Sequence, residues 1–214
     1  EVAAAARKSG ANATVIELAD RVCARALTQE MSDWVHALHM RHGVDIRLSA
    51  AFERFEGDGK LERAVLGDGS AIPCDIAVVG IGLVPNTELA EQAGLAIDNG
   101  IVVDEHGQTS HPYIYAAGDV TNHPNSLLGR RVRLESWENA QNQAINAAKA
   151  MLGTPQPYAE IPWFWSDQYD ANIQMMGLPE DWNETVTRGD RDAGEFIEFY
   201  LKDGELQGAA AINN

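Results

Sequence analysis

The run Ala116-Ala117-Gly118-Asp119 constrains the fold of this chain more than any other segment. It ends an apolar stretch that begins at Ile114, so we predict a short strand that stops at a glycine and is followed by an aspartate. Glycine lets a backbone come close to a ligand, and open α/β sheets bind ligands beyond the carboxyl ends of their strands. A plain Gly-Asp turn after a strand is the alternative, and these four residues alone favour it.

The pattern of the rest predicts an α/β architecture in which helices and strands alternate. Thr28 and Ser136 are candidate N-caps for two helices, the first ending at Gly43 and the second covering 137–151. The apolar run 75–80 suits a strand that is buried on both faces. Further expected elements are a helix over 1–10, strands over 13–17, 44–48, 101–103 and 114–117, and a hairpin over 52–66 that turns at 57–59.

Both ends of the sequence look cut. The chain opens at Glu1 inside an alanine-rich helix without an N-cap, and the strand over 206–212 has no closing element after it. We therefore expect residues to be missing on both sides. The stretch 153–162 holds three prolines and is predicted to be a linker, followed from Trp163 by a small β-rich unit.

Composition narrows the function classes. The chain has 16 basic and 32 acidic side chains, a formal charge of −16, which argues against a nucleic-acid or anionic-membrane surface. No apolar run approaches the roughly 20 residues that span a bilayer. Cys23 and Cys74 lack CxxC spacing, so we predict two reduced thiols in a cytoplasmic protein. The six histidines form no metal-ligand pattern and are interpreted as surface residues.

Two features point to a dinucleotide. Glu17 ends a predicted strand, where an acid about 20 residues after a phosphate-loop glycine binds the ribose of NAD and disfavours NADP. Counting back places that glycine loop before Glu1, outside the sequence. Gly80 and Gly82, at the end of another strand, permit close approach of a ligand. A solvated strand end and a glycine-rich crossover are the respective alternatives.

Two aromatic features point to a flavin. Trp137 opens the predicted helix 137–151, whose free N–H groups and partial positive charge suit the pyrimidine side of a flavin. Strand alternation places Trp163 and Trp165 on one face and Phe164 on the other. A capped helix with an interfacial tryptophan and a small-domain core are the alternatives, and the first is favoured for Trp137 taken alone.

Taken in order, these pieces resemble the FAD-dependent ferredoxin reductases that serve Rieske dioxygenases and some cytochromes P450. The matching runs lie at 1–4, 14–17, 80–86, 115–120, 135–140 and 162–168, so the resemblance covers nearly the whole chain. It implies parts of two Rossmann-like domains, one for NAD and one for FAD, followed by a small α+β domain. The implied boundaries are an NAD-binding domain over 1–83 without its glycine loop, the C-terminal part of an FAD-binding domain over 84–153, and a truncated reductase C-terminal domain over 154–214.

The resemblance also implies roles for single residues. In the FAD site, Asp119 holds the ribityl chain, Gly118 and Val120 flank it, Trp137 sits at the pyrimidine edge and Trp163 lies near the isoalloxazine ring. In the NAD site, Glu1 lies near the nicotinamide, Glu17 binds the adenosine ribose, and Gly80 and Gly82 border the cleft. No residue is assigned as a certain catalytic group, and no metal is expected.

The implied activity is passage of electrons from NADH through FAD to a 2Fe-2S ferredoxin that feeds a terminal oxygenase, with the fragment alone expected to be inactive. Ferredoxins of this kind are usually acidic, so the basic residues Arg130, Arg131 and Arg133 are predicted to form a local docking patch. A solvated loop is an equal alternative. Other functions left open are a rubredoxin reductase, an NADH oxidase-type flavoenzyme and a non-enzymatic NAD/FAD-binding flavoprotein.

Overall fold

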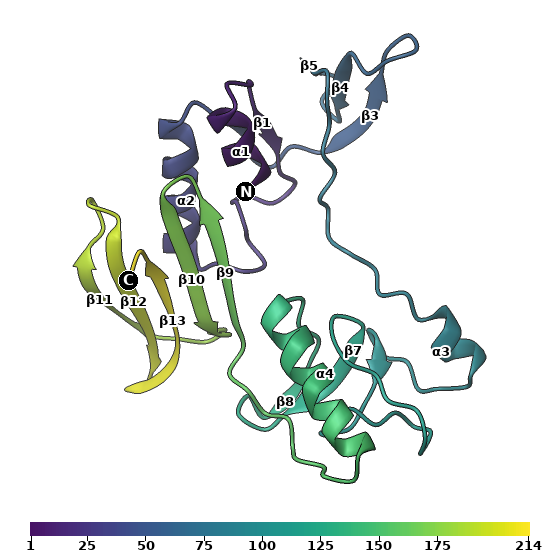
Figure 1. Ribbon diagram of the computed structural model, residues 1–214. Helices are drawn as coiled ribbons and strands as arrows, with labels where there is room; N and C mark the ends of the chain where they lie inside the picture. The colour runs from purple at the N-terminus through teal and green to yellow at the C-terminus, as the bar shows by residue number, and fades with distance from the viewer.

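The computed structural model describes residues 1–214 and places the helices and strands in separate groups (Figure 1). Helices α1 and α2, strands β1 and β2 and the C-terminal strands form one group, the hairpin strands β3–β5 stand apart from it, and α3, α4 and β6–β8 form another (Figure 1). The elements are α1 (Val2–Lys8), β1 (Thr14–Ile16), α2 (Gln29–Arg41), β2 (Asp45–Arg47), β3 (Phe52–Glu56), β4 (Arg63–Leu66), β5 (Ala71–Pro73), α3 (Glu88–Gln92), β6 (Ile101–Val102), β7 (Thr121–Asn125), β8 (Arg130–Val132), α4 (Trp137–Met151), β9 (Trp163–Gln168), β10 (Ala171–Gly177), β11 (Glu184–Asp190), β12 (Glu195–Lys202) and β13 (Glu205–Ile212).

Parallel strand pairs confirm the α/β class. β1 pairs in parallel with β2, and β6 pairs in parallel with β7. The predicted caps are present: the Thr28 hydroxyl accepts from the Met31 N–H at the start of α2, and the Ser136 hydroxyl accepts from the Asn139 N–H at the start of α4. Local sequence therefore set where both long helices begin.

The C-terminal unit is an antiparallel sheet in the order β11-β12-β13-β10-β9. One face of this sheet packs on the apolar side of α2, and together they form the main core. Its buried members are Val22, Leu27, Met31, Val35, Leu38, Ala171, Ile173, Met175, Phe196, Tyr200, Ala210 and Ile212. Burying this apolar surface joins the end of the chain to its first helices and fixes β9, the edge strand, beside α1 and α2.

A buried polar network crosses the same interface. The Tyr200 hydroxyl donates to Glu198 Oε2 at 2.8 Å and lies 2.9 Å from the Thr28 hydroxyl. Glu198 is 1% exposed and also pairs with Arg191. The N-cap of α2 is thus tied to strand β12 by side chains that are far apart in the sequence.

Two predicted strands are absent. The segment 75–80 is irregular, and its side chains are exposed, with Ile76 at 82% and Val78 at 66%. An apolar strand stays regular only where neighbouring strands complete its hydrogen bonds, and no strand of this chain pairs with 75–80. The segment 114–117 makes only an isolated bridge from Tyr115 to Gln108, for the same reason.

The interpretation of all histidines as surface residues is also wrong. His39 is 6% exposed and His123 is 1% exposed. Burial, with a smaller contribution from the Arg131 charge, lowers the pKa of His123 to about 4, so this ring is neutral at pH 7. No helix of the structure is both long enough and apolar enough to cross a membrane.

Candidate functional site

A side chain of α4 supports the Gly118-Asp119 turn by hydrogen bonding. Gly118 is buried with φ +85°, and its N–H donates to Gln143 Oε1 at 2.7 Å. The Thr121 hydroxyl donates to the same oxygen at 2.8 Å. The Asp119 carbonyl accepts from Arg133 at 3.3 Å, whereas its carboxylate makes no hydrogen bond within the chain. The turn is therefore rigid, and the carboxylate is free to bind a ligand.

Gln143 supports this turn, and its replacement gives a testable result. We expect Gln143→Leu to lower the free energy of unfolding by about 2 kcal/mol, because the buried Gly118 N–H would lose its acceptor. Gln141→Leu, an exposed change on the same helix, should cost less than about 0.5 kcal/mol. Urea unfolding of both variants checks this, and equal stabilities would show that Gln143 does not support the turn.

Three tryptophans gather between α4 and β9. Trp163 and Trp165 stack with ring centroids 5.0 Å apart, which confirms that alternation puts them on one face of the strand. Trp137 lies edge-on to Trp165 at 6.2 Å, and both are exposed. Phe164 packs on the opposite side, against the main core. Exposed aromatic groups of this kind mark binding surfaces.

The predicted nicotinamide residue lies on the other side of β9. Glu1 stands at the start of α1 without a side-chain cap hydrogen bond, and its Oε1 accepts from the Ser166 hydroxyl at 2.7 Å. Ser166 alternates with Trp165 along the strand, so the two side chains point to opposite faces. Strand β9 thus joins the predicted NAD residue to the predicted flavin wall.

The remaining predicted NAD residues are Glu17, Gly80 and Gly82. Glu17 follows β1, and its carboxylate accepts from the Ala19 N–H at 2.8 Å. Although Cys23 is exposed as a residue, desolvation of its sulfur raises the pKa of the thiol, and the carboxylates of Glu17 and Glu1 add to the rise. Gly80 lies in the exposed segment 75–80, and a Cβ placed on it would meet no other atom within 4 Å.

The Arg25 side chain lies close both to Gly82 and to the residue that precedes the N-cap of α4. A Cβ placed on Gly82 would stand 3.0 Å from the Arg25 guanidinium. The same guanidinium lies 3.7 Å from Glu135, just before α4. The φ of +97° at Gly82 favours glycine independently.

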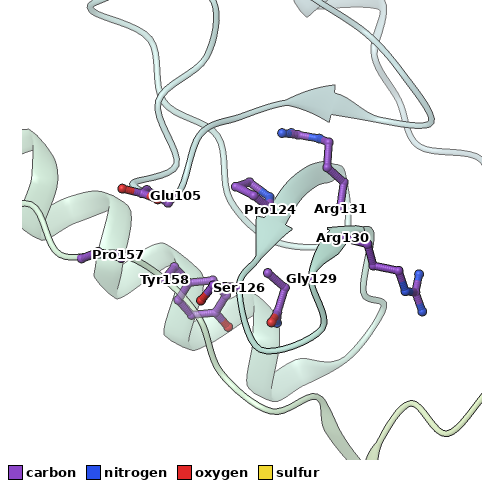
Figure 2. Close-up of a pocket in the computed structure, with 9 residues that line it drawn as sticks. Glu105, Pro124, Ser126, Gly129, Arg130, Arg131, Pro157 and Tyr158 are labelled. Atoms are coloured by element: carbon purple, nitrogen blue, oxygen red, sulfur yellow. The ribbon is translucent and has the colours of Figure 1, made fainter.

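The three arginines of the predicted docking patch do not act alike. Arg131 donates to the Val103 carbonyl and to Asn122, and Arg133 pairs with Glu135 and is 10% exposed. These two side chains therefore stabilise their own region. Arg130 and Arg131 are both exposed as residues, but Arg130 bonds to no carbonyl of the chain and pairs only with the exposed Glu180. Figure 2 shows the side chains of Arg130 and Arg131 diverging from neighbouring positions of β8.

A cavity of about 400 Å³ lies beside these arginines (Figure 2). It is lined by the β7–β8 hairpin, Glu105 and the linker residues Pro157 and Tyr158. None of the predicted FAD or NAD residues lines it. Of the predicted cofactor residues, Trp163 lies in β9 and Glu1 contacts that strand, and both are outside this cavity.

Sequence reasoning missed the residues that hold the site together. Gln143, Thr121 and Ser166 each bond to a predicted site residue or its turn. The strong helix 137–151 showed that Gln143 is helical, but a single glutamine carries no sign of the loop that it supports. Ser166 lies inside the aromatic run 162–168, and alternation predicts that its side chain lies on the face opposite the tryptophans.

Comparisons with known proteins give a consistent result. The model of the pyridine nucleotide-disulphide oxidoreductase family matches residues 1–144, and the reductase C-terminal model matches residues 163–214. The ferredoxin–NAD(+) reductase component of the anthranilate 1,2-dioxygenase system of Burkholderia cepacia is 48% identical over 217 residues. That match covers all of this chain and 53% of the relative.

Solved structures agree with the fold. A ferredoxin reductase from Rhodopseudomonas palustris superposes with a TM-score of 0.94 at 39% identity, covering 99% of this chain and 52% of that one. The reductase in a covalent putidaredoxin reductase–putidaredoxin complex gives 0.92 at 39% identity, covering 99% and 52%. The chain thus spans about half the length of the relatives that it matches.

Proposed function

Because the chain belongs to the pyridine nucleotide-disulphide oxidoreductase family, we propose that it is part of an FAD-dependent NADH:ferredoxin oxidoreductase that feeds an oxygenase. The observation that carries this proposal is the arrangement around β9. One face of that strand holds Glu1, the predicted nicotinamide residue, and the other presents Trp163 and Trp165 beside Trp137. Hydride transfer requires contact between the nicotinamide and the flavin, so we place their meeting point at the free edge of β9, between Glu1 and the tryptophans.

The residues present fit the FAD that the family implies. The Asp119 carboxylate makes no hydrogen bond within the chain, and it follows Gly118, whose φ of +85° shapes the turn. A carboxylate accepts hydrogen bonds from hydroxyl groups, as a ribityl chain requires. Trp137 and Trp163 would exclude water from the ring. The chemistry supplied by bound FAD is acceptance of a hydride and release of electrons one at a time.

The protein groups then set orientation and charge. The free N–H groups and partial positive charge at the start of α4 stabilise negative charge at the pyrimidine edge. Glu17 would accept hydrogen bonds from the adenosine ribose and repel the extra phosphate of NADP. Gly80 and Gly82 would leave room for the dinucleotide beside them, and Val120 would border the FAD turn.

The partner that we propose is a 2Fe-2S ferredoxin. The relative from Burkholderia cepacia is named a ferredoxin–NAD(+) reductase component, and the second solved structure is a complex with putidaredoxin. A strongly acidic chain needs a local positive group for an acidic partner. Arg131 and Arg133 bond within their own region, whereas Arg130 is held only by an ion pair with the exposed Glu180, so we assign this role to Arg130.

Charge reversal at Arg130 tests the docking role. Arg130→Glu in the full-length protein should lower ferredoxin-dependent cytochrome c reduction about tenfold at low salt, because steering is lost, while NADH–ferricyanide activity stays the same. Arg188→Glu, the same charge change at an exposed position of β11, is the control. Equal loss of both activities, or loss of neither, would contradict the assignment.

Two further expectations belong to this proposal. We place the NAD-binding part at 1–83, the FAD-binding part at 84–153 and the C-terminal unit at 154–214, supported by the two long connections drawn in Figure 1. We also propose a cytoplasmic location, supported by the two free thiols of Cys23 and Cys74.

Reduction of cytochrome c by the full-length protein with NADH must depend on added ferredoxin. Equal rates without ferredoxin would refute the proposed electron acceptor.

A further inference from the structure

One face of β9 connects Glu1 to the buried part of the molecule. Phe164, Ser166 and Gln168 share this face by alternation. Phe164 packs on the main core, and Gln168 is 6% exposed. Ser166 lies between them and reaches the Glu1 carboxylate. Ser166 therefore lies between the partly buried Phe164 and the buried Gln168.

A line of hydrogen bonds runs along this face. His39 Nε2 lies 2.5 Å from Gln168 Oε1, Gln168 Nε2 donates to the Ser166 hydroxyl at 3.1 Å, and that hydroxyl donates to Glu1 Oε1 at 2.7 Å. The Tyr169 hydroxyl lies 3.3 Å from His39 Nδ1. The line is continuous from buried α2 to the surface.

The direction of the protons in this line follows from chemistry. An amide oxygen only accepts, so His39 must donate from Nε2 to Gln168, and its Nδ1 is left to accept from Tyr169. Burial lowers the pKa of His39, which leaves a neutral ring with one N–H, as this assignment needs. Gln168 then has only its NH₂ group for Ser166. An ionised carboxylate only accepts, so the single hydroxyl proton of Ser166 points at Glu1.

The Glu1 carboxylate is held by one oxygen only. Oε1 accepts from Ser166, and Oε2 makes no hydrogen bond within the chain although the residue is exposed. A carboxylate that is fixed at one oxygen presents the other in a defined direction. An N–H donor of a ligand beside α1 would meet that second oxygen.

We propose that Ser166 is a positioning residue for the nicotinamide, holding Glu1 so that Oε2 accepts a hydrogen bond from the carboxamide N–H of NAD. The C-terminal unit thereby completes the NAD site from across the molecule. This inference rests on the proposed function, because it requires NAD to bind at Glu1. It assigns Ser166 a role that acts through Glu1 alone.

A binding measurement tests the inference without turnover. Calorimetry on the full-length, FAD-containing protein compares NAD⁺ with 3-acetylpyridine adenine dinucleotide, which has the same shape but no amide N–H. The unmodified protein should prefer NAD⁺ about tenfold, the value of one hydrogen bond to a charged group. Ser166→Ala should reduce this preference to about twofold, and Ser166→Thr, which keeps the hydroxyl, should restore it.

Two further variants separate positioning from folding. Ser9→Ala removes an exposed hydroxyl from the other end of α1 and should leave the preference unchanged. In a Glu1→Ala background, Ser166→Ala should have no further effect on the preference, because Ser166 acts through Glu1. A tenfold preference that survives Ser166→Ala, or an additive loss in the double variant, overturns the inference while the proposed function stands. Failure of the unmodified protein to bind either dinucleotide overturns both.

Discussion

Asp119→Ala in the full-length protein should weaken FAD binding at least about a hundredfold. The carboxylate is free within the chain and is expected to accept two hydrogen bonds from ribityl hydroxyls, each worth about 1.5 kcal/mol. No other side chain of the described turn can replace it, because Gly118 has none and Val120 is apolar. The measurement is the dissociation constant for FAD, from flavin fluorescence quenching on the apoprotein.

Two variants control this experiment. Asp119→Asn keeps one acceptor oxygen and should lose about tenfold, an intermediate effect. Asp58→Ala removes an aspartate from the exposed Gly57-Asp58-Gly59 turn between β3 and β4 and should bind FAD normally. If Asp119→Ala binds FAD as tightly as Asp58→Ala, the assignment of the ribityl anchor is wrong.

Tyr200→Ala should lower the free energy of unfolding of the α2–sheet unit by about 3–5 kcal/mol. The ring is fully buried and packs against Trp182, so its removal leaves a cavity. The change also removes the hydroxyl that joins Thr28 to Glu198, which leaves a buried carboxylate with fewer partners. Urea unfolding followed by tryptophan fluorescence measures the loss.

Tyr200→Phe separates the two contributions. It keeps the packing of the ring and removes only the hydroxyl, so we expect a loss of about 1–3 kcal/mol. If the two variants were equally stable, the ring would add nothing beyond its hydroxyl. If Tyr200→Phe were as stable as the unmodified protein, the network through Thr28 and Glu198 would carry no stability.

Local signals predicted the parts of the fold that depend on neighbours in sequence. Thr28 and Ser136 identified the starts of two helices, since capping is a contact with the next turn. The hairpin over 52–66 followed from its glycines and aspartate, although its connection covers 57–62 and is longer than the predicted turn at 57–59. Alternation in β9 correctly placed Trp163 and Trp165 on one face, because alternation depends only on the spacing of residues along the strand.

Contacts across the chain could not be predicted in this way. Ser166 and Glu1 are 165 positions apart, and nothing in either residue type indicates the other. The apolar run 75–80 was expected to be buried, but an apolar pattern describes a preference and does not supply the neighbouring strands. Arg131 and Arg133 looked like free surface charges, because a sequence does not show which carbonyls surround a guanidinium.

The central claim is that this chain contributes to one site where NADH meets FAD. The most direct test is an anaerobic titration of the full-length protein with NADH, followed by flavin absorbance. We predict that the purified protein carries flavin and that about one equivalent of NADH bleaches its absorbance. A protein without flavin absorbance, or a bound flavin whose spectrum does not change on addition of NADH, would contradict it.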